Sequence, residues 1–373
     1  MHLPRAALED WMRDFYFDTA IDLGSSGVQC WSLGELRRLL GITAEELDGI
    51  ALDDSPSYGG PALRRAIADR FAAGDTDRVM ATHGSTEAIF VVMNALLSAG
   101  DEVVVVDPAY HSLTSVAEAI GCRLVPWRLR PETGFRPDIG ELRALVTPRT
   151  RMIVANFPHN PTGAHLTREQ FDELLALVDG HDLHLVWDAA FAELVHGHEP
   201  LPDPSTLHDR CVGLGTMSKA YGLPGTRVGW CLAAPEILAR LVPLRDALTI
   251  CVSPLTEHLA ARALDGADVL LADRRAQASR NLERLEEWAG DNADLVSWTR
   301  PWGGVTAFPA FPGVADTEDL CRELGRRHDV LLVPGSGFGH LDRVRLGFGG
   351  AEDRFAEGLT RLRKALAERR VAC

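Results

Sequence analysis

Lysine is rare in this chain of 373 residues. Only Lys219 and Lys364 stand among its 38 lysine and arginine residues. Because an arginine side chain stays protonated and cannot form an imine, a lysine retained in such a chain is a candidate for carbonyl chemistry. Lys364 lies in a charged amphipathic stretch near the C-terminus, which is typical of a solvated surface. The surroundings of Lys219 are different and indicate chemistry.

The residues around Lys219 are suited to hold a phosphate group. Thr216 and Ser218 place hydroxyl groups at the end of a predicted strand, and Arg227 follows beyond a glycine-rich turn. Hydroxyl groups and one guanidinium offer phosphate oxygens several charge-assisted hydrogen bonds. A lysine beside such a cradle predicts an aldehyde cofactor anchored by its phosphate, pyridoxal 5′-phosphate. The alternative is a surface lysine in a glycine-rich connection.

Two other predicted strand ends fit the same cofactor. Gly84, Ser85 and Thr86 stand where a strand passes into a helix, so backbone N–H groups at a helix N-terminus are available to phosphate. Asp188 ends an apolar strand, and a carboxylate there would pair with the pyridinium nitrogen and keep the ring electron-withdrawing. For both positions an ordinary helix cap is the alternative.

Two residues after further strands are candidates for contacts with the cofactor ring. Asn160, in an Asn-Pro-Thr-Gly segment, could bond the phenolate oxygen of the ring, and a simple Pro/Gly turn is the alternative. Tyr110 could lay its ring on the pyridine face, and a core tyrosine is the alternative.

Alternating strands and helices over about residues 79–233 must position these side chains. The strand expected at 102–107 contains four consecutive valines, as in a strand buried on both faces. This alternation predicts an α/β fold with a mostly parallel sheet covered by helices, and ligands bind at the carboxyl ends of such strands. Apolar runs predict strands at 79–82, 102–107, 122–127, 152–156, 184–188, 212–215 and 227–231.

The pattern changes after about residue 234. Long helical segments cover roughly 235–290, and a smaller α+β unit follows. We therefore expect three parts: an N-terminal segment at 1–45 that packs with the small domain, a large cofactor-binding domain at 46–275 and a small domain at 276–373.

Composition excludes several classes of protein. The formal net charge of −15 argues against a nucleic-acid or anionic-membrane partner, since both are bound through an excess of Lys and Arg. No apolar stretch reaches the length of a membrane helix, and no secretory leader is visible. The seven cysteines are scattered without CxxC spacing, which indicates a reducing cytoplasm and no thiolate metal site.

Together these motifs resemble the class I and II aminotransferases of fold type I. The resemblance spans nearly the whole chain, and it implies pyridoxal 5′-phosphate, a homodimer with shared active sites and defined residue roles. By it, Lys219 would be the lysine that condenses with the cofactor and carries a proton, and Arg345 would clamp the substrate α-carboxylate. The residues that carry the resemblance are Gly84-Ser85-Thr86, Tyr110, Asn160-Pro161-Thr162-Gly163, Asp188, Ser218-Lys219, Arg227, Pro334-Gly335-Ser336 and Arg345.

Further segments resemble one cyclising branch of this family. That branch implies ring closure of 3-hydroxy-L-arginine with loss of the β-hydroxyl as water, in antibiotic biosynthesis, and substrate contacts at Ser26 and Gly27. An ordinary aminotransferase, which passes the amino group to a keto acid, is the alternative activity. The segments are 25–28, 34–37, 156–161, 187–191, 195–196 and 303–309.

The chain also departs from the ordinary aminotransferase pattern. Phe191 stands where such enzymes carry a tyrosine, so it cannot donate a hydrogen bond to the ring oxygen. The partner of the substrate guanidine stays open at this stage, with Glu35, Ser25 and His159 as candidates. A regulator on the same fold would carry a DNA-binding module in front, for which residues 1–20 are too few. The histidines near 181–198 lack HExxH spacing, so we expect no metal.

Overall fold

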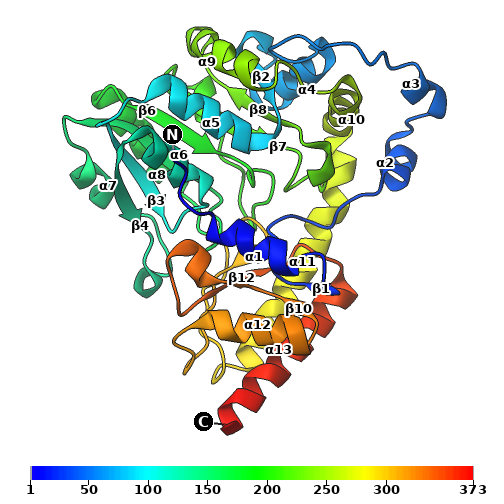
Figure 1. The fold of residues 1–373 in the computed structure, drawn as a ribbon, viewed down its shortest axis with the longest axis vertical. Coiled ribbons are helices and arrows are strands. Elements are labelled where there is room, and N and C mark those ends of the chain that lie inside the picture. The colour runs from blue at the N-terminus through cyan, green and yellow to red at the C-terminus, as the bar shows by residue number, and fades with distance from the viewer. Residues whose placement is uncertain (1, 373) are drawn as a thin grey trace.

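A seven-stranded sheet forms the centre of the molecule (Figure 1). The structure, a computed structural model, describes residues 2–372. The strands are β2 (Val79–Thr82), β3 (Glu102–Asp107), β4 (Arg123–Arg128), β5 (Thr150–Asn156), β6 (His184–Asp188), β7 (Cys211–Thr216) and β8 (Gly229–Leu232). Their order is β2-β8-β7-β6-β5-β3-β4; β8 is antiparallel to both neighbours, and the other pairs are parallel.

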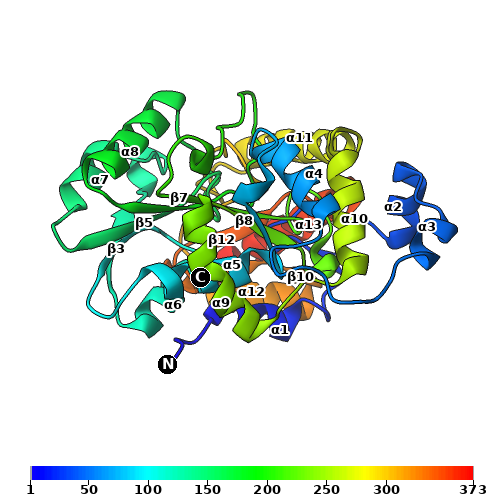
Figure 2. The same ribbon diagram turned by 90° about the horizontal axis from the view of Figure 1, so that it is seen from above.

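Helices cover both faces of this sheet, as Figure 2 shows. Successive residues of β3 point into different cores: Val103 and Val105 pack with α5, α6 and α9, whereas Val104 and Val106 pack with α4, α7, α8 and α10. Burial on both faces explains the continuous apolar runs of the strands. These helices are α4 (Pro61–Phe71), α5 (Gly84–Leu96), α6 (Ser112–Ile120), α7 (Ile139–Leu145), α8 (Arg168–Gly180), α9 (Pro235–Leu248) and α10 (Pro254–Asp265).

A smaller α+β unit lies below the large sheet in Figure 1. Its antiparallel sheet has the order β11-β12-β9, from β9 (Thr306–Ala307), β11 (Val333–Pro334) and β12 (Val344–Gly347). The long helix α11 (Ala267–Asp291) runs between the two units, and α12 (Thr317–Arg327) and α13 (Glu352–Ala372) complete the smaller one. Short 3-10 turns are η1 (Thr76–Arg78), η2 (Pro131–Thr133), η3 (Pro204–Thr206), η4 (Pro224–Thr226) and η5 (Gly335–Phe338).

The N-terminal segment packs on the smaller unit. Strand β1 (Ile21–Asp22) pairs in parallel with β10 (Val330–Leu331), and Trp11 of α1 (Ala7–Phe15) donates its indole N–H to the Leu332 carbonyl at 2.8 Å. Helices α2 (Leu33–Leu40) and α3 (Ala44–Asp48) stand off to one side of the body (Figures 1 and 2). The segment between α1 and α2 contacts both units, because the Leu23 N–H donates to the Leu331 carbonyl and the Val28 N–H to the Lys219 carbonyl.

The predicted α/β fold with a mostly parallel sheet is confirmed. The last predicted strand began too early, at residue 227. Arg227 takes a left-handed conformation with φ of 52°, which a strand cannot contain, so β8 starts at Gly229. Across the described residues, no helix combines the length and apolar character needed to cross a bilayer.

Candidate active site

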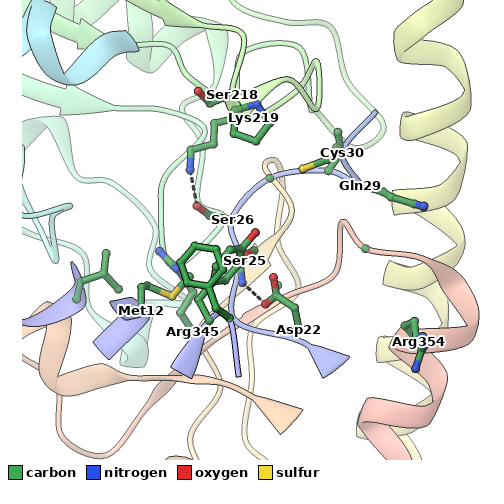
Figure 3. A pocket seen from close by; sticks show the side chains of 18 of the residues that line it. Met12, Asp22, Ser25, Ser26, Gln29, Cys30, Ser218, Lys219, Arg345 and Arg354 are labelled. Carbon is green, nitrogen blue, oxygen red and sulfur yellow. Dashed lines mark hydrogen bonds between the residues drawn. The ribbon is translucent and has the colours of Figure 1, made fainter. Parts of the chain in front are cut away.

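A cavity of about 640 Å³ lies where the N-terminal segment, the large sheet and the smaller unit meet (Figure 3). Six of the predicted site residues come together here, since the lining includes Ser26, Gly27, Tyr110, Ser218, Lys219 and Arg345. The other lining residues are Leu8, Glu9, Met12, Arg13, Tyr16, Phe17, Ala20, Asp22, Ser25, Val28, Gln29, Cys30, Pro224, Gly347, Gly350, Ala351, Arg354 and Phe355.

Lys219 reaches into this cavity just after the end of β7. Its Nζ donates a hydrogen bond to Ser26 Oγ at 2.9 Å, and Figure 3 shows the two side chains pointing toward one another. Within residues 2–372, no carboxylate lies within ion-pair distance of this ammonium group. Burial, and then the charge of Arg345, lowers the pKa of Lys219 from 10.5 to about 8. The amine therefore loses its proton at a lower pH than a free lysine does, which favours condensation with an aldehyde.

Arg345 in β12 lines the same cavity, with 3% of its surface exposed. Its Nε donates to the Gly24 carbonyl at 3.0 Å and its Nη1 to Asn160 Oδ1 at 3.5 Å. Burial lowers the pKa of Arg345 to about 10, and no carboxylate of the described residues pairs with it. A buried guanidinium without an anionic partner suits a carboxylate ligand.

Asp188 lies at the carboxyl end of β6, directly beside Asn156 in the sheet register. The Asn156 side chain links the two loops, because its Nδ2 donates to the Asp188 carbonyl at 2.9 Å and its Oδ1 accepts from the Asn160 N–H at 2.9 Å. The Asp188 carboxylate accepts the Ala190 N–H at 3.0 Å, and burial raises its pKa to about 6. A cationic ring nitrogen would compensate this buried acid.

Arg227 and the N-terminus of α5 form a second polar region. Gly84 takes a φ of +74°, a conformation that favours glycine, and a Cβ atom built on it would lie 2.8 Å from Arg227 Nη2. A Cβ atom built on Gly229 would lie 2.7 Å from the Ser85 backbone nitrogen, so β8 packs closely against the same helix end. Ser218 N–H donates to Thr216 Oγ1 at 3.1 Å on the lysine side. These groups have the chemistry of a phosphate cradle.

The site can now be compared with known proteins. A family model described as aminotransferase class I and II matches residues 45–362. The chain belongs to this family. It is 48% identical to capreomycidine synthase of Streptomyces vinaceus, over 98% of this chain and 94% of that protein. It is 32% identical to an arginine–pyruvate transaminase of Pseudomonas aeruginosa, over 83% of this chain and 81% of that enzyme.

Solved structures give the same assignment. The crystal structure of the PLP-dependent cyclase OrfR superposes with a TM-score of 0.93 at 43% identity, covering 99% of this chain and 98% of that one. The predicted resemblance to the aminotransferase family and to its cyclising branch is therefore confirmed. Aminotransferases of class I and II imply pyridoxal 5′-phosphate as the cofactor.

The residues of this family member fit that cofactor. A lysine with a lowered pKa, a buried unpaired carboxylate and a glycine-permitted cradle at a helix N-terminus match its aldehyde, ring nitrogen and phosphate. Tyr110 lines the cavity and donates its hydroxyl to Glu9 Oε1 at 2.9 Å, and burial raises its pKa. In the single chain, Thr86 and Arg227 are exposed. Between residues 2 and 372, no group of three or more His, Cys, Asp or Glu side chains could hold a metal.

Two candidates for the guanidine partner lie outside the cavity. Glu35 caps α2, where its carboxylate accepts the Ser32 N–H at 2.8 Å. His159 is buried, and both ring nitrogens already have partners, Thr162 Oγ1 and the Pro108 carbonyl, each at 2.7 Å. Ser25, the third candidate, does line the cavity.

Sequence analysis missed the acidic residues of the cavity, Glu9 and Asp22. Neither belongs to a motif, and both lie about 200 residues before Lys219 in the chain. The only signal available was that the N-terminal segment was expected to pack with the smaller unit, which brings it beside Arg345.

Proposed function

We propose that this protein closes a ring in 3-hydroxy-L-arginine to give L-capreomycidine, with loss of the β-hydroxyl as water. The observation that carries the proposal is the 48% identity to capreomycidine synthase over nearly the full length of both chains. The site supports it, since a lysine of lowered pKa and a free buried guanidinium lie in one cavity. This activity would serve the biosynthesis of a peptide-type antibiotic.

The roles of this chain's residues follow from their positions. Pyridoxal 5′-phosphate, when bound, supplies an electron sink for bonds broken at the substrate Cα. Arg345 binds the α-carboxylate and so orients the Cα–H bond toward Lys219. Lys219, held as a neutral amine, takes the Cα proton at Nζ. Asp188 would pair with a cationic ring nitrogen of this cofactor and so maintain the electron demand of the ring.

Loss of the hydroxyl group then prepares the ring closure. The Cβ–O bond breaks and the hydroxyl leaves with a proton as water, and a guanidine nitrogen of the same molecule forms a bond to Cβ while losing its own proton. Lys219 returns a proton to Cα. Because nucleophile and electrophile belong to one bound molecule, orientation in the cavity replaces a bimolecular encounter.

A mass measurement separates this function from the alternative one. Purified holoenzyme given 3-hydroxy-L-arginine, with no keto acid, should yield a product lighter by one water. Turnover that occurs only with a keto acid, and that gives a 2-oxo acid, would overturn the cyclase proposal in favour of an aminotransferase. The similarity to an arginine–pyruvate transaminase supports that alternative.

We further propose that the protein acts as a homodimer in the cytoplasm. Thr86 and Arg227, both assigned to the phosphate, are exposed in the single chain, and a second copy would enclose them. Large apolar side chains are exposed on the arm after α3 and around the end of α9, at Leu52, Leu248 and Ile250. Light scattering should give twice the mass of 40.7 kDa. The cysteines in the described residues are free, which suits a reducing compartment.

The division into domains is part of the same proposal. Residues 46–275 would bind the cofactor and residues 276–373 would form the small domain, with residues 1–45 packed against it. The hydrogen bond from Trp11 to Leu332 supports this last placement. The boundary falls inside α11, so one rigid helix would join both domains.

A further inference from the structure

The charged side chains of the main cavity are not all used by the proposed reaction. Lys219 and Arg345 have tasks there. Glu9 and Asp22, the acidic residues among those that line the cavity, have none so far. Carboxylates grouped in a cavity with cationic residues favour a ligand that carries both charges, such as an amino acid with a basic side chain.

Asp22 is held with one oxygen free. Its Oδ1 accepts the N–H groups of Gly24 and Ser25, each at 2.8 Å, so backbone geometry at the end of β1 orients the carboxylate (Figure 3). No described residue donates a hydrogen bond to Oδ2 or forms an ion pair with this side chain. Its charge is the largest influence raising the pKa of Arg345, so it faces the substrate end of the cavity.

Glu9 approaches the same region from helix α1. Its Oε1 accepts the Tyr110 hydroxyl at 2.9 Å and lies 3.9 Å from His111 Nδ1. The negative charge of Glu9 raises the pKa of Lys219 and of Arg345, so it acts on both groups that flank the substrate. The side chain keeps 44% of its surface exposed, so a ligand can reach it.

We propose that Glu9 and Asp22 bind the guanidinium group of the substrate. This inference rests on the proposed function, because ring closure requires the guanidine nitrogen to approach Cβ, one bond from the Cα that Lys219 and Arg345 flank. A subsite for that group must therefore lie in the same cavity as both cations, as these two carboxylates do. The planar guanidinium has five N–H donors and can engage two carboxylates at once.

The two other arginines that line the cavity, Arg13 and Arg354, form no ion pair with Glu9 or Asp22. Arg13 pairs with Asp10 at 2.8 Å on its own helix. Arg354 is exposed on α13 and, in Figure 3, stands away from the pair of Lys219 and Ser26. If Arg354 instead governed side-chain recognition, the cavity would favour an acidic amino acid, and the two models predict opposite substrate preferences.

The test compares two ligands of nearly equal shape on the holoenzyme. L-arginine carries the guanidinium, and L-citrulline replaces it with a neutral urea. Calorimetric titration without a keto acid should show that wild type prefers arginine. Glu9→Gln and Asp22→Asn should each weaken arginine binding by about tenfold or more, the loss expected for one charge-assisted contact, and leave citrulline binding within about twofold. The double variant should bind both ligands equally.

The variants and their control keep the inference falsifiable. Gln at position 9 can still accept the Tyr110 hydroxyl, and Asn at position 22 can still accept both backbone N–H groups, so folding should persist and is checked by thermal unfolding. Arg354→Gln, which alters another cavity charge, should leave the arginine preference intact. Equal binding of arginine and citrulline by wild type, or an unchanged preference in the double variant, would overturn the subsite.

The subsite and the proposed reaction can fail separately in these experiments. Should wild type discriminate through Glu9 and Asp22 but fail to dehydrate 3-hydroxy-L-arginine, the subsite stands and the cyclase proposal fails. Should wild type form the cyclic product while the double variant still prefers arginine, the cyclase proposal stands and the subsite fails.

Discussion

Lys219 Nζ and Ser26 Oγ lie 2.9 Å apart, although 193 residues separate them in the chain. Ser26 has 5% of its surface exposed, and it is held on the segment that follows β1. The hydroxyl accepts a hydrogen bond from the amine on which the proposed chemistry depends. It therefore helps to set both the position of that amine and its affinity for a proton.

Ser26→Ala should lower the pH at which apoenzyme takes up the cofactor. Removing the hydroxyl removes an acceptor for the ammonium form, so the pKa of Lys219 falls below about 8. Stopped-flow measurement of pyridoxal 5′-phosphate uptake against pH reports this midpoint. Turnover should also fall, by about tenfold if one hydrogen bond to a charged group is lost. Ser25→Ala is the control, and an equal shift in it would contradict a specific role for Ser26.

Lys219→Ala should abolish both the visible absorption band of the bound cofactor and catalysis. Among the described residues that line the cavity, Lys219 carries the one primary amine, the group that condenses with an aldehyde. Lys364→Ala is a matched control, because Lys364 is the chain's other lysine and lies at the surface, 3.9 Å from Glu368. Normal turnover by the Lys219 variant would refute the assignment.

Asp188→Asn should lower kcat by about a hundredfold or more while leaving the fold intact, since an amide cannot neutralise a cationic ring nitrogen. Asp203 is the control, because it is a second buried acid whose pKa burial also raises to about 6. Asp203 accepts hydrogen bonds from Ser205 and does not line the cavity. Asp203→Asn should change the melting temperature without altering the cofactor spectrum. If Asp203→Asn lowered kcat and Asp188→Asn changed only the melting temperature, Asp203 would be the residue that pairs with the ring nitrogen.

The stability of the apoenzyme should carry a contribution from Lys219 that increases with pH. Its pKa is lowered from 10.5 to about 8, so between these values the unfolded chain holds a proton that the folded chain has released. The free energy of unfolding then rises with pH through this window, and the cost of the buried charge is greatest below about pH 8. Urea unfolding of wild type and Lys219→Met should show a difference that shrinks from pH 7.5 to 10. A constant difference would mean that the pKa of Lys219 is not lowered.

The local sequence pattern was sufficient to predict most strands of the large domain. Valine runs such as 103–106 predicted a strand buried on both faces, and the side chain of Asp188 could be placed at a strand end because parallel strands present their carboxyl ends at one edge. The start of β8 was misjudged because the apolar run was extended back over Val228 to Arg227, whereas Arg227 is the left-handed residue that ends the turn η4.

The sequence by itself was enough to predict Lys219 as the reactive amine, because residue type, the scarcity of lysine and nearby hydroxyl groups are local facts. Only the tertiary structure decided which side chains surround that amine. Ser26 was predicted only as a substrate contact implied by a resemblance, and Glu9 and Asp22 were not predicted at all. All three reach the cavity because Ile21–Asp22 pairs with Val330–Leu331 and α1 packs beside β11. Such pairing depends on burial across distant segments, which a linear pattern does not encode.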